Sequence, residues 1–292
     1  IATKFNCQHF TDPESLMASG DVNAIAICTS TDTHVEVLLM ASKHGKPVFC
    51  EKPISLSLPE TDRALKAISD SKTPLMLGFN RRYDPSHRSV HDSVANGAIG
   101  DVHLARITSR DPGPPPVEYA KVSGGIFIDM TIHDFDMARY VVGSEIVSVY
   151  ATGAVRIVPE FAEIGDLDTV ALMLQHANGA ITMIDNSRQA VYGYDQRVEV
   201  FGSKGMTASE NPLTTSTINR NENGTQLGKM PYFFLDRYIP AYIAEWNEFM
   251  GVATGKIKPV VTGADGRASL VAGLAAWKSV REGRVVKTSE IG

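Results

Sequence analysis

Short apolar runs alternate with longer amphipathic segments over the first 80 residues of the chain. The runs span 24–28, 47–50 and 75–79, whereas the segments between them, 33–44 and 58–71, repeat apolar residues at helical spacing. An apolar run without alternation suits a strand that is buried on both faces. Strands that alternate with helices of this length predict a parallel sheet with right-handed crossovers.

The pattern changes near residue 101, where longer segments begin to alternate apolar and polar residues. Asn178-Gly179 is a strong hairpin turn between two of these segments. Successive strands without helices between them predict a second domain with a mostly antiparallel sheet. A polar segment, 211–229, is expected to be a mobile loop, and two helices, 238–253 and 266–282, are expected to close the chain. The predicted strands are 102–109, 147–158, 169–175, 180–187 and 197–201.

The start of the chain lacks the usual opening of a dinucleotide-binding sheet. That opening consists of a strand, a Gly-x-Gly-x-x-Gly turn, a helix, and a strand that ends near an acidic residue. No Gly-x-Gly occurs in the 292 residues, and a short polar strand-like stretch, 4–8, runs straight into a helix. We therefore expect the parallel sheet to be incomplete at its start by one βαβ unit of ~30 residues. Either an unrecorded segment precedes Ile1, or the gene product is truncated.

Composition and charge exclude several classes of protein. With a net charge of −5 and no basic stripe, the chain is not expected to bind nucleic acid. No run of 18 apolar residues is present that could span a membrane, and the first twenty residues lack a secretory core. No HExxH motif or cysteine cluster offers a metal site. Of the three cysteines, Cys28 and Cys50 lie in apolar runs and are expected to be buried thiols in a reducing cytoplasm.

The most informative segment for function is 124–136, an apolar run that opens with two glycines. It contains Asp129 and His133, four residues apart. In a helix, residues at this spacing share a face, so a carboxylate and an imidazole would project into the same space. An imidazole titrates near neutral pH and exchanges protons, and a carboxylate beside it orients it or binds a polar substrate. The alternative is a helix start in which Asp129 complements the dipole and His133 is a satisfied, half-buried residue.

Two further polar segments follow predicted buried strands. Ligands of open α/β sheets bind beyond the carboxyl ends of the strands, where Lys52 lies in the turn Glu51-Lys52-Pro53. The alternative for Lys52 is an ordinary surface lysine. The hydroxyl-rich segment 29–34 could bind a ribose or a phosphate at a helix start, or it could simply cap the helix.

Taken together and in this order, these segments resemble the Gfo/Idh/MocA family of NAD(P)-dependent sugar and cyclitol dehydrogenases. The resemblance covers nearly the whole chain, and the Glu-Lys-Pro turn with the Asp-x-x-x-His segment is its most specific pair. Within the family it is greatest to the inositol 2-dehydrogenases, through segments 81–85, 128–134 and 192–197. The matching segments as a whole are 29–34, 51–53, 78–85, 124–136 and 198–205.

The resemblance implies a fold class and a division into domains. It implies an α/β protein with an N-terminal Rossmann-type parallel sheet, here incomplete at its start. An α+β domain with a large, mostly antiparallel open sheet would follow. Residues 1–80 would form the partial NAD(P)-binding domain. Residues 81–292 would bind the small-molecule substrate and build a homodimer or homotetramer through the open sheet.

The resemblance also implies roles for single residues. Lys52, Asp129 and His133 would be the catalytic set, with His133 as the proton acceptor. The cofactor would contact Thr29, Ser30, His34, Glu51, Lys52 and Arg82. A polyol needs several hydrogen-bonding partners, and the candidates are Asn80, Asp129, His133, Tyr194 and Tyr238.

The reaction expected on these grounds is the oxidation of a secondary hydroxyl of an inositol-like cyclitol or sugar to a ketone, with hydride transfer to NAD. NADP stays open, because the residue that decides lies in the missing segment. Two alternatives stay open as well. One is a glycosidase of the same family that keeps NAD bound, and the other is a non-catalytic sugar-sensing or scaffold relative with impaired cofactor binding.

Overall fold

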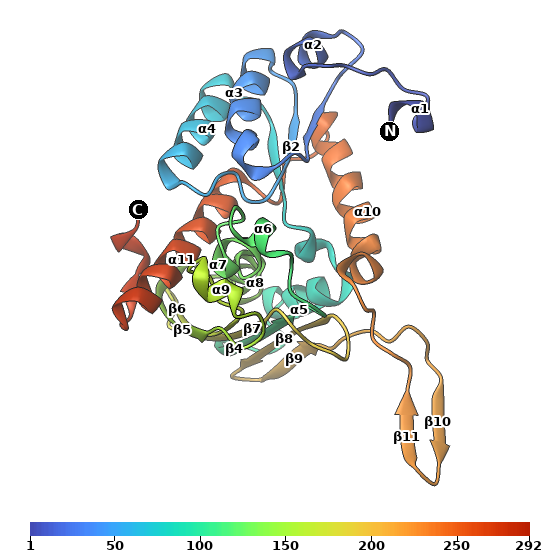
Figure 1. Cartoon of the computed structure of the whole chain (residues 1–292), viewed down its shortest axis with the longest axis vertical. Coiled ribbons are helices and arrows are strands. Elements are labelled where there is room, and N and C mark those ends of the chain that lie inside the picture. The colour runs from blue at the N-terminus through green and yellow to red at the C-terminus, as the bar shows by residue number, and fades with distance from the viewer. The chain divides into compact units, whose positions relative to one another are not determined.

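The computed structural model describes the whole chain, residues 1–292, which divides into two compact units. The N-terminal unit comprises 1–78 and 246–267, and the C-terminal unit comprises 79–245 and 268–292. Two long helices contribute residues to both units: α10 (Phe234–Ala253) and α11 (Gly263–Glu282) (Figure 1). The division of functions expected at residue 80 stays a prediction.

The N-terminal unit is built on a three-stranded parallel sheet, as the sequence predicts. The strands are β1 (Ile25–Ile27), β2 (Val48–Glu51) and β3 (Leu75–Gly78), and they pair in that order. The connecting helices, α3 (His34–His44) and α4 (Leu58–Ser71), pack against each other. The sheet and α10 share an aromatic cluster, in which the ring centroid of Phe49 lies 5.9 Å from that of Trp246 and 5.7 Å from that of Phe249.

Local chemistry sets the ends of the helices in this unit. Helix α2 (Pro13–Ala18) begins with a proline at its first position, and its N-cap Asp12 accepts a hydrogen bond from Ser15 N at 2.9 Å. Helix α3 ends at Gly45, whose φ of 62° lies in the left-handed region that a side chain disfavours. The peptide bond between Lys52 and Pro53 is cis.

Two expectations for this unit are wrong. The stretch 4–8 is not a strand, because α1 (Ala2–Phe5) is helical and no strand lies here for it to pair with. A helical turn closes its own backbone hydrogen bonds, whereas a strand needs a partner. Cys28 is exposed rather than buried, because β1 ends one residue before it, while Cys50 within β2 is buried as expected.

The C-terminal unit is built on a seven-stranded sheet of order β12-β5-β6-β7-β4-β8-β9. Strands β4 and β7 pair in parallel, and every other neighbouring pair is antiparallel. The large, mostly antiparallel sheet predicted from the sequence is thus confirmed. Its strands are β4 (Val102–Arg110), β5 (Ile146–Ala154), β6 (Thr169–His176), β7 (Ile181–Ser187), β8 (Asp195–Gly202), β9 (Gly205–Ser209) and β12 (Val286–Lys287).

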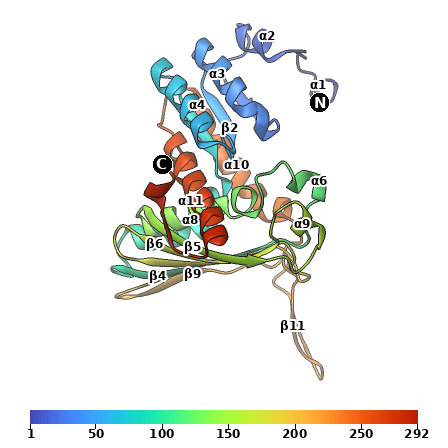
Figure 2. The same ribbon diagram turned by 60° about the vertical axis from the view of Figure 1, so that its left-hand side comes forward.

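Helices cover one face of this sheet and leave the other bare (Figures 1 and 2). The core lies between the sheet and the covering helices α5 (Pro85–Ala95), α7 (Ile126–Asp129), α8 (Ile132–Val142) and α11. Along β6, buried residues alternate with exposed ones because successive side chains point to opposite faces. We call the bare side the outer face. The short helices of the unit are η2 (Asn80–Tyr83), α6 (Val117–Ala120), α9 (Glu160–Glu163) and η3 (Thr288–Glu290).

The segment 211–229, expected to be a loop, contains a two-stranded hairpin. Its strands are β10 (Ile218–Asn221) and β11 (Gly224–Leu227), which pair with each other and with no other strand. Helix α10 begins four residues before the predicted start at 238, and α11 begins three residues before 266. None of the helices is both long enough and apolar enough to cross a membrane.

Candidate active site

The segment with the double glycine folds into two short helices rather than one. Helix α7 ends at Asp129, and His133 lies in the first turn of α8, so Met130 and Thr131 separate the two helices. Asp129 and His133 therefore do not share one continuous helix. The turn before α7 needs a glycine, because Gly125 has φ 74° and a Cβ there would lie 2.6 Å from the Trp277 ring.

Two side chains bind the two oxygens of the Asp129 carboxylate. The hydroxyl of Tyr119 donates to Oδ1 at 2.8 Å, and Nη1 of Arg188 donates to Oδ2 at 3.1 Å. Burial, with the neighbouring charge of Asp129, raises the pKa of Tyr119, so the phenol keeps its proton and remains a donor. Asp129 is thus fixed as an acceptor at the surface of the core, with 14% of its side chain exposed.

His133 is half-buried and packs edge-on against a neighbouring aromatic ring. Its ring centroid lies 6.0 Å from that of Phe79, at an interplanar angle of 87°. This contact limits the rotation of the imidazole, which leaves the ring oriented rather than free to turn with solvent.

A buried polar cluster around Asp134 lies next in the chain. Its Oδ1 accepts hydrogen bonds from Arg81 Nη1 at 2.6 Å and from Ser109 Oγ, and its Oδ2 accepts one from Asn186 Nδ2 at 2.8 Å. Asn186 in turn accepts from Thr131 Oγ1 at 2.6 Å. Burial raises the pKa of Asp134, although the charge of Arg81 opposes the shift. The cluster ties β4 and β7 to the break between α7 and α8.

The two tyrosines predicted to contact the substrate meet near Arg81. Tyr194 and Tyr238 are both buried, and their rings cross at 89° with centroids 5.8 Å apart. Burial raises the pKa of Tyr238 to about 12 and raises that of Tyr194 as well, so both phenols keep their protons. Asn80, the residue before Arg81 in η2, is also buried. The C-terminal unit therefore brings Tyr194 and Tyr238 to the same guanidinium, while the position of the Asn80 side chain relative to it stays a prediction.

Asp111 is a candidate that the sequence did not indicate. Its backbone is pinned, since its N–H donates to Ser187 O at 3.0 Å and its carbonyl accepts from Ala190 N at 2.6 Å. Burial raises the pKa of its carboxyl to about 6, while the charges of Arg81 and Arg188 oppose that shift. This acid is invisible in the sequence because it follows a strand end with no motif around it. It adds a further carboxyl group to those that lie near Arg81 and Arg188.

Arg82 takes a partner inside the C-terminal unit. It forms a two-point ion pair with Asp136, from Nε to Oδ2 at 2.8 Å and from Nη2 to Oδ1 at 2.6 Å, and both groups are buried. Its guanidinium also lies 5.1 Å from the centroid of the Tyr140 ring. This pair joins η2 to α8, and the contact with the cofactor expected for Arg82 stays a prediction.

The remaining predicted residues lie at the carboxyl edge of the parallel sheet in the N-terminal unit. His34 is buried, and its two ring nitrogens lie 2.8 Å from Pro53 O and 3.1 Å from Thr29 O. It therefore ties the turn after β1 to the turn that carries Lys52. Burial raises the pKa of Glu51, against the lowering effect of the Lys52 charge.

The space beside Glu51 depends on a glycine in the next strand. A Cβ on Gly78 would lie 2.8 Å from Glu51 Oε2, so any larger residue there would displace the carboxylate. Thr29 and Ser30 are exposed at the same edge, beyond β1, and the hydroxyl of Thr29 lies 2.6 Å from that of Thr33. This edge therefore presents hydroxyl groups, a carboxyl group and an ammonium group beyond the ends of adjacent parallel strands.

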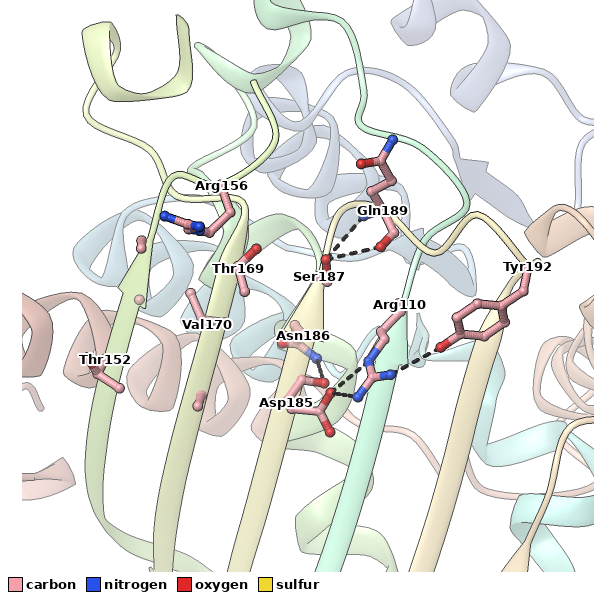
Figure 3. Close-up of a pocket in the computed structure, with 13 residues that line it drawn as sticks. Arg110, Thr152, Arg156, Thr169, Val170, Asp185, Asn186, Ser187, Gln189 and Tyr192 are labelled. Atoms are coloured by element: carbon pink, nitrogen blue, oxygen red, sulfur yellow. Dashed lines mark hydrogen bonds and ion pairs between the residues drawn. The ribbon is translucent and has the colours of Figure 1, made fainter. Parts of the chain in front are cut away.

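A hollow of about 660 Å³ lies on the outer face of the large sheet (Figure 3). Arg110 crosses it, donating to Asp185 from Nε at 2.8 Å and to the hydroxyl of Tyr192 at 3.0 Å. Because side chains alternate along β7, Asp185 lies at the hollow while the amide of Asn186 reaches Asp134 in the core. None of the predicted catalytic, cofactor-binding or substrate-binding residues lines this hollow.

Comparison with sequence families matches both halves of the chain. Residues 1–79 match the family described as an oxidoreductase family with an NAD-binding Rossmann fold. Residues 87–208 match the GFO/IDH/MocA C-terminal domain. Together these segments account for more than half of the chain. The first contains the parallel sheet, and the second contains most of the strands of the large sheet.

Characterised relatives and solved structures cover nearly the whole chain. A myo-inositol 2-dehydrogenase of Thermotoga maritima is 46% identical over 97% of this chain and 84% of its own length. An inositol 2-dehydrogenase of Rhizobium meliloti is 45% identical over 98% of this chain and 86% of its own length. The crystal structure of a probable dehydrogenase from Thermotoga maritima superposes with a TM-score of 0.98 at 44% identity, covering 100% of this chain and 88% of that one. A scyllo-inositol dehydrogenase of Lactobacillus casei was crystallised with NAD(H) and scyllo-inositol. Its structure superposes with a TM-score of 0.91 at 28% identity, covering 99% of this chain and 87% of that one.

Proposed function

The chain belongs to the Gfo/Idh/MocA family of oxidoreductases, and from this membership we propose that it oxidises a ring hydroxyl of an inositol to the ketone with NAD as the hydride acceptor. The observation that carries the proposal is the Asp129 and His133 pair, held in the C-terminal unit beside a buried cluster of polar groups. The relatives named above are dehydrogenases, which favours this activity over a glycosidase or a scaffold.

We assign the catalytic roles by position in the family motifs. His133 takes the proton of the reacting hydroxyl, because an imidazole exchanges protons near neutral pH. Lys52 supplies a compact positive charge that favours the developing alkoxide. Asp129, fixed by Tyr119 and Arg188, accepts a hydrogen bond from a neighbouring hydroxyl of the ring or orients His133.

The edge of the parallel sheet fits the nicotinamide and ribose half of NAD. The exposed hydroxyls of Thr29 and Ser30 suit a ribose or an amide, and Glu51 has the room beside it that Gly78 provides. NAD, when bound, supplies the hydride acceptor for the reaction. His34 positions this edge by joining its two turns. The choice between NAD and NADP stays open.

The polar groups around Arg81 suit a polyol. An inositol presents a hydroxyl on every ring carbon, so its recognition needs both donors and acceptors in fixed positions. Tyr194 and Tyr238 are donors because their phenols stay protonated, and Asp111 is an added acceptor when ionised. We expect discrimination between inositol isomers to depend on these groups, and we expect the enzyme to work in the cytoplasm.

We also propose that the outer face of the large sheet joins two or more copies of the chain. Residues directly opposite each other on neighbouring strands share a face, and two such rows cross the sheet. The first row is Gln175, Ile181, Leu104, Phe201 and Met206. The second row is Tyr150, Met173, Met183, Arg106, Glu199 and Ala208.

The exposure of these rows supports an interface. Met173 and Met206 are 52% and 53% exposed, and Phe201 is 46% exposed. An apolar patch of this kind on a soluble protein marks an interaction surface, and a homodimer is the commonest assembly. Light scattering at micromolar concentration tests the assembly, and a monomeric mass would contradict it.

The activity is tested by following NADH formation with myo-inositol, scyllo-inositol and glucose as separate substrates. We expect turnover with at least one inositol and slower turnover with glucose, because the alcohol groups of the inositols are all on ring carbons. The matched control is Glu160→Gln, an exposed acid of α9 that has no role in the proposal. Absence of turnover on every inositol, in protein that binds NAD, would contradict the assignment.

A further inference from the structure

The hairpin formed by β10 and β11 stands apart from the rest of its unit. Every residue of both strands is exposed, and neither strand pairs with the large sheet. An isolated two-stranded hairpin is marginally stable in water because it has no face against which to bury side chains. We call residues 212–230 the arm.

The arm carries an apolar pair on one of its two faces. Ile218 and Leu227 lie directly opposite each other in the hairpin register and are 50% and 58% exposed. The next pair, Asn219 and Gln226, lies on the other face and is wholly polar. Arg220 and Thr225 follow on the same face as Ile218 and Leu227, so the arm presents a single apolar pair near its root, and nothing in its own chain covers that pair.

The root of the arm is held firmly to the sheet. The side chain of Asn211 accepts a hydrogen bond from Gln196 N at 2.8 Å and donates to Asp195, both at the start of β8. After β11, Pro231 O accepts a hydrogen bond from Tyr194 N at 2.9 Å. A fixed root aims the arm in one direction, which a disordered tail would not do.

The arm extends beyond the outer face of the large sheet. In both views the helices of the C-terminal unit lie on one side of the large sheet, and the arm extends on the other side (Figures 1 and 2). A second copy packed on the outer face would therefore meet the arm. The arm has Arg220 and Glu222 near its tip, one charge of each sign, so it has no strong preference for a polyanion or a polycation.

The outer face has about the area that an interface with a second copy of the chain needs. The seven strands contain 48 residues in total, and at about 3.3 Å per residue and about 4.8 Å between strands they cover roughly 760 Å² of sheet. A stable interface buries about 800 Å² on each partner. The face alone is close to that size, and an arm folded over the partner adds to it.

We propose that the arm packs against the flank of a second copy of this chain, with Ile218 and Leu227 as the side chains that become buried. The proposal rests on the face-to-face assembly proposed above and is independent of which substrate is turned over. It explains why an otherwise polar hairpin has two large apolar residues opposite each other.

The test compares two double variants of the full-length protein. Ile218→Ser/Leu227→Ser removes the apolar pair, and the control Asn219→Ser/Gln226→Ser changes the polar face of the same hairpin. Sedimentation velocity over a range of concentrations gives the dissociation constant of the assembly. We expect the apolar variant to weaken assembly about tenfold or more and the control to leave it nearly unchanged.

A second measurement avoids any effect of the serines on hairpin folding. A photo-crosslinking residue replaces Leu227 in an otherwise unchanged chain, and we expect covalent dimers after irradiation. Equal dissociation constants for the two double variants, or crosslinks only within one chain, would overturn the proposal. NADH formation is measured on the same samples. If turnover is normal and the apolar variant assembles as the parent does, the proposal for the arm alone is refuted. If no sample turns over but the apolar variant assembles more weakly, the proposed activity alone is refuted.

Discussion

The side chain of Arg188 is only 1% exposed, and its Nη1 donates a hydrogen bond to the carboxylate of Asp129 at 3.1 Å. A second carboxylate, that of Asp166, lies 3.6 Å from Nη2 of the same guanidinium. Asp166 in turn accepts a hydrogen bond from Ile126 N at the start of α7. One buried cation thus fixes both ends of α7, and with them the position of the predicted catalytic carboxylate.

Replacement of Arg188 by methionine should destabilise the fold strongly. The change leaves two partly buried carboxylates without their cation, and breaking a buried pair costs about 3–5 kcal/mol. Urea denaturation gives the free energy of unfolding. The control is Arg267→Met, because Arg267 pairs with Asp62 at the surface and such pairs contribute about 0–1 kcal/mol. Similar losses for the two variants would show that Arg188 does not organise the core.

Asp111 should make stability depend on pH in a defined window. Burial raises its pKa from 3.8 to about 6 in the folded protein, so the native state binds this proton more tightly than the unfolded state. Its contribution to stability is present in full below pH 3.8 and is lost as the pH rises through about 6. Asparagine does not titrate, so the stability of Asp111→Asn relative to the parent should rise across that window. A constant difference between the two proteins would contradict the assignment.

Lys52→Ala should lower kcat with myo-inositol by about 10²-fold or more, because removing one group that stabilises developing charge typically has that effect. The melting temperature should change little, since Lys52 lies at a turn and is not part of the core. Lys52→Arg should also be poor, because a planar guanidinium cannot replace a compact ammonium. Steady-state kinetics check both variants, and a parent-like rate for the alanine variant would return Lys52 to the class of ordinary surface lysines.

The order of elements was predictable because it depends on local patterns. Continuous apolar runs became the buried parallel strands, and alternating runs became the open sheet, as helix and strand periodicities require. The errors occurred where context decides. The stretch 4–8 has strand-like composition but no partner strand, and Cys28 lies one residue beyond the end of β1. The hairpin in 211–229 is too polar for a periodicity to reveal.

The candidate site was only partly predictable, for a similar reason. Asp129 and His133 are close in sequence, so spacing alone indicated a shared site. Their supporting residues are distant, since Arg188 is 59 positions from Asp129. Asp111 sits at a strand end with no motif, and it joins the cluster only when the sheet brings it toward Arg81 and Arg188. A single sequence holds no local pattern for such long-range pairs.

The account depends most directly on His133, and the deciding measurement is the kcat of His133→Ala with an inositol, made beside the affinity of the same variant for NAD. We expect kcat to fall by about 10²–10⁴-fold, the usual contribution of a general acid or base, while NAD affinity stays close to that of the parent. The rising limb of the pH dependence of kcat/KM should disappear in the residual activity. Normal turnover with a lowered melting temperature would instead make His133 a structural residue and remove the proposed mechanism.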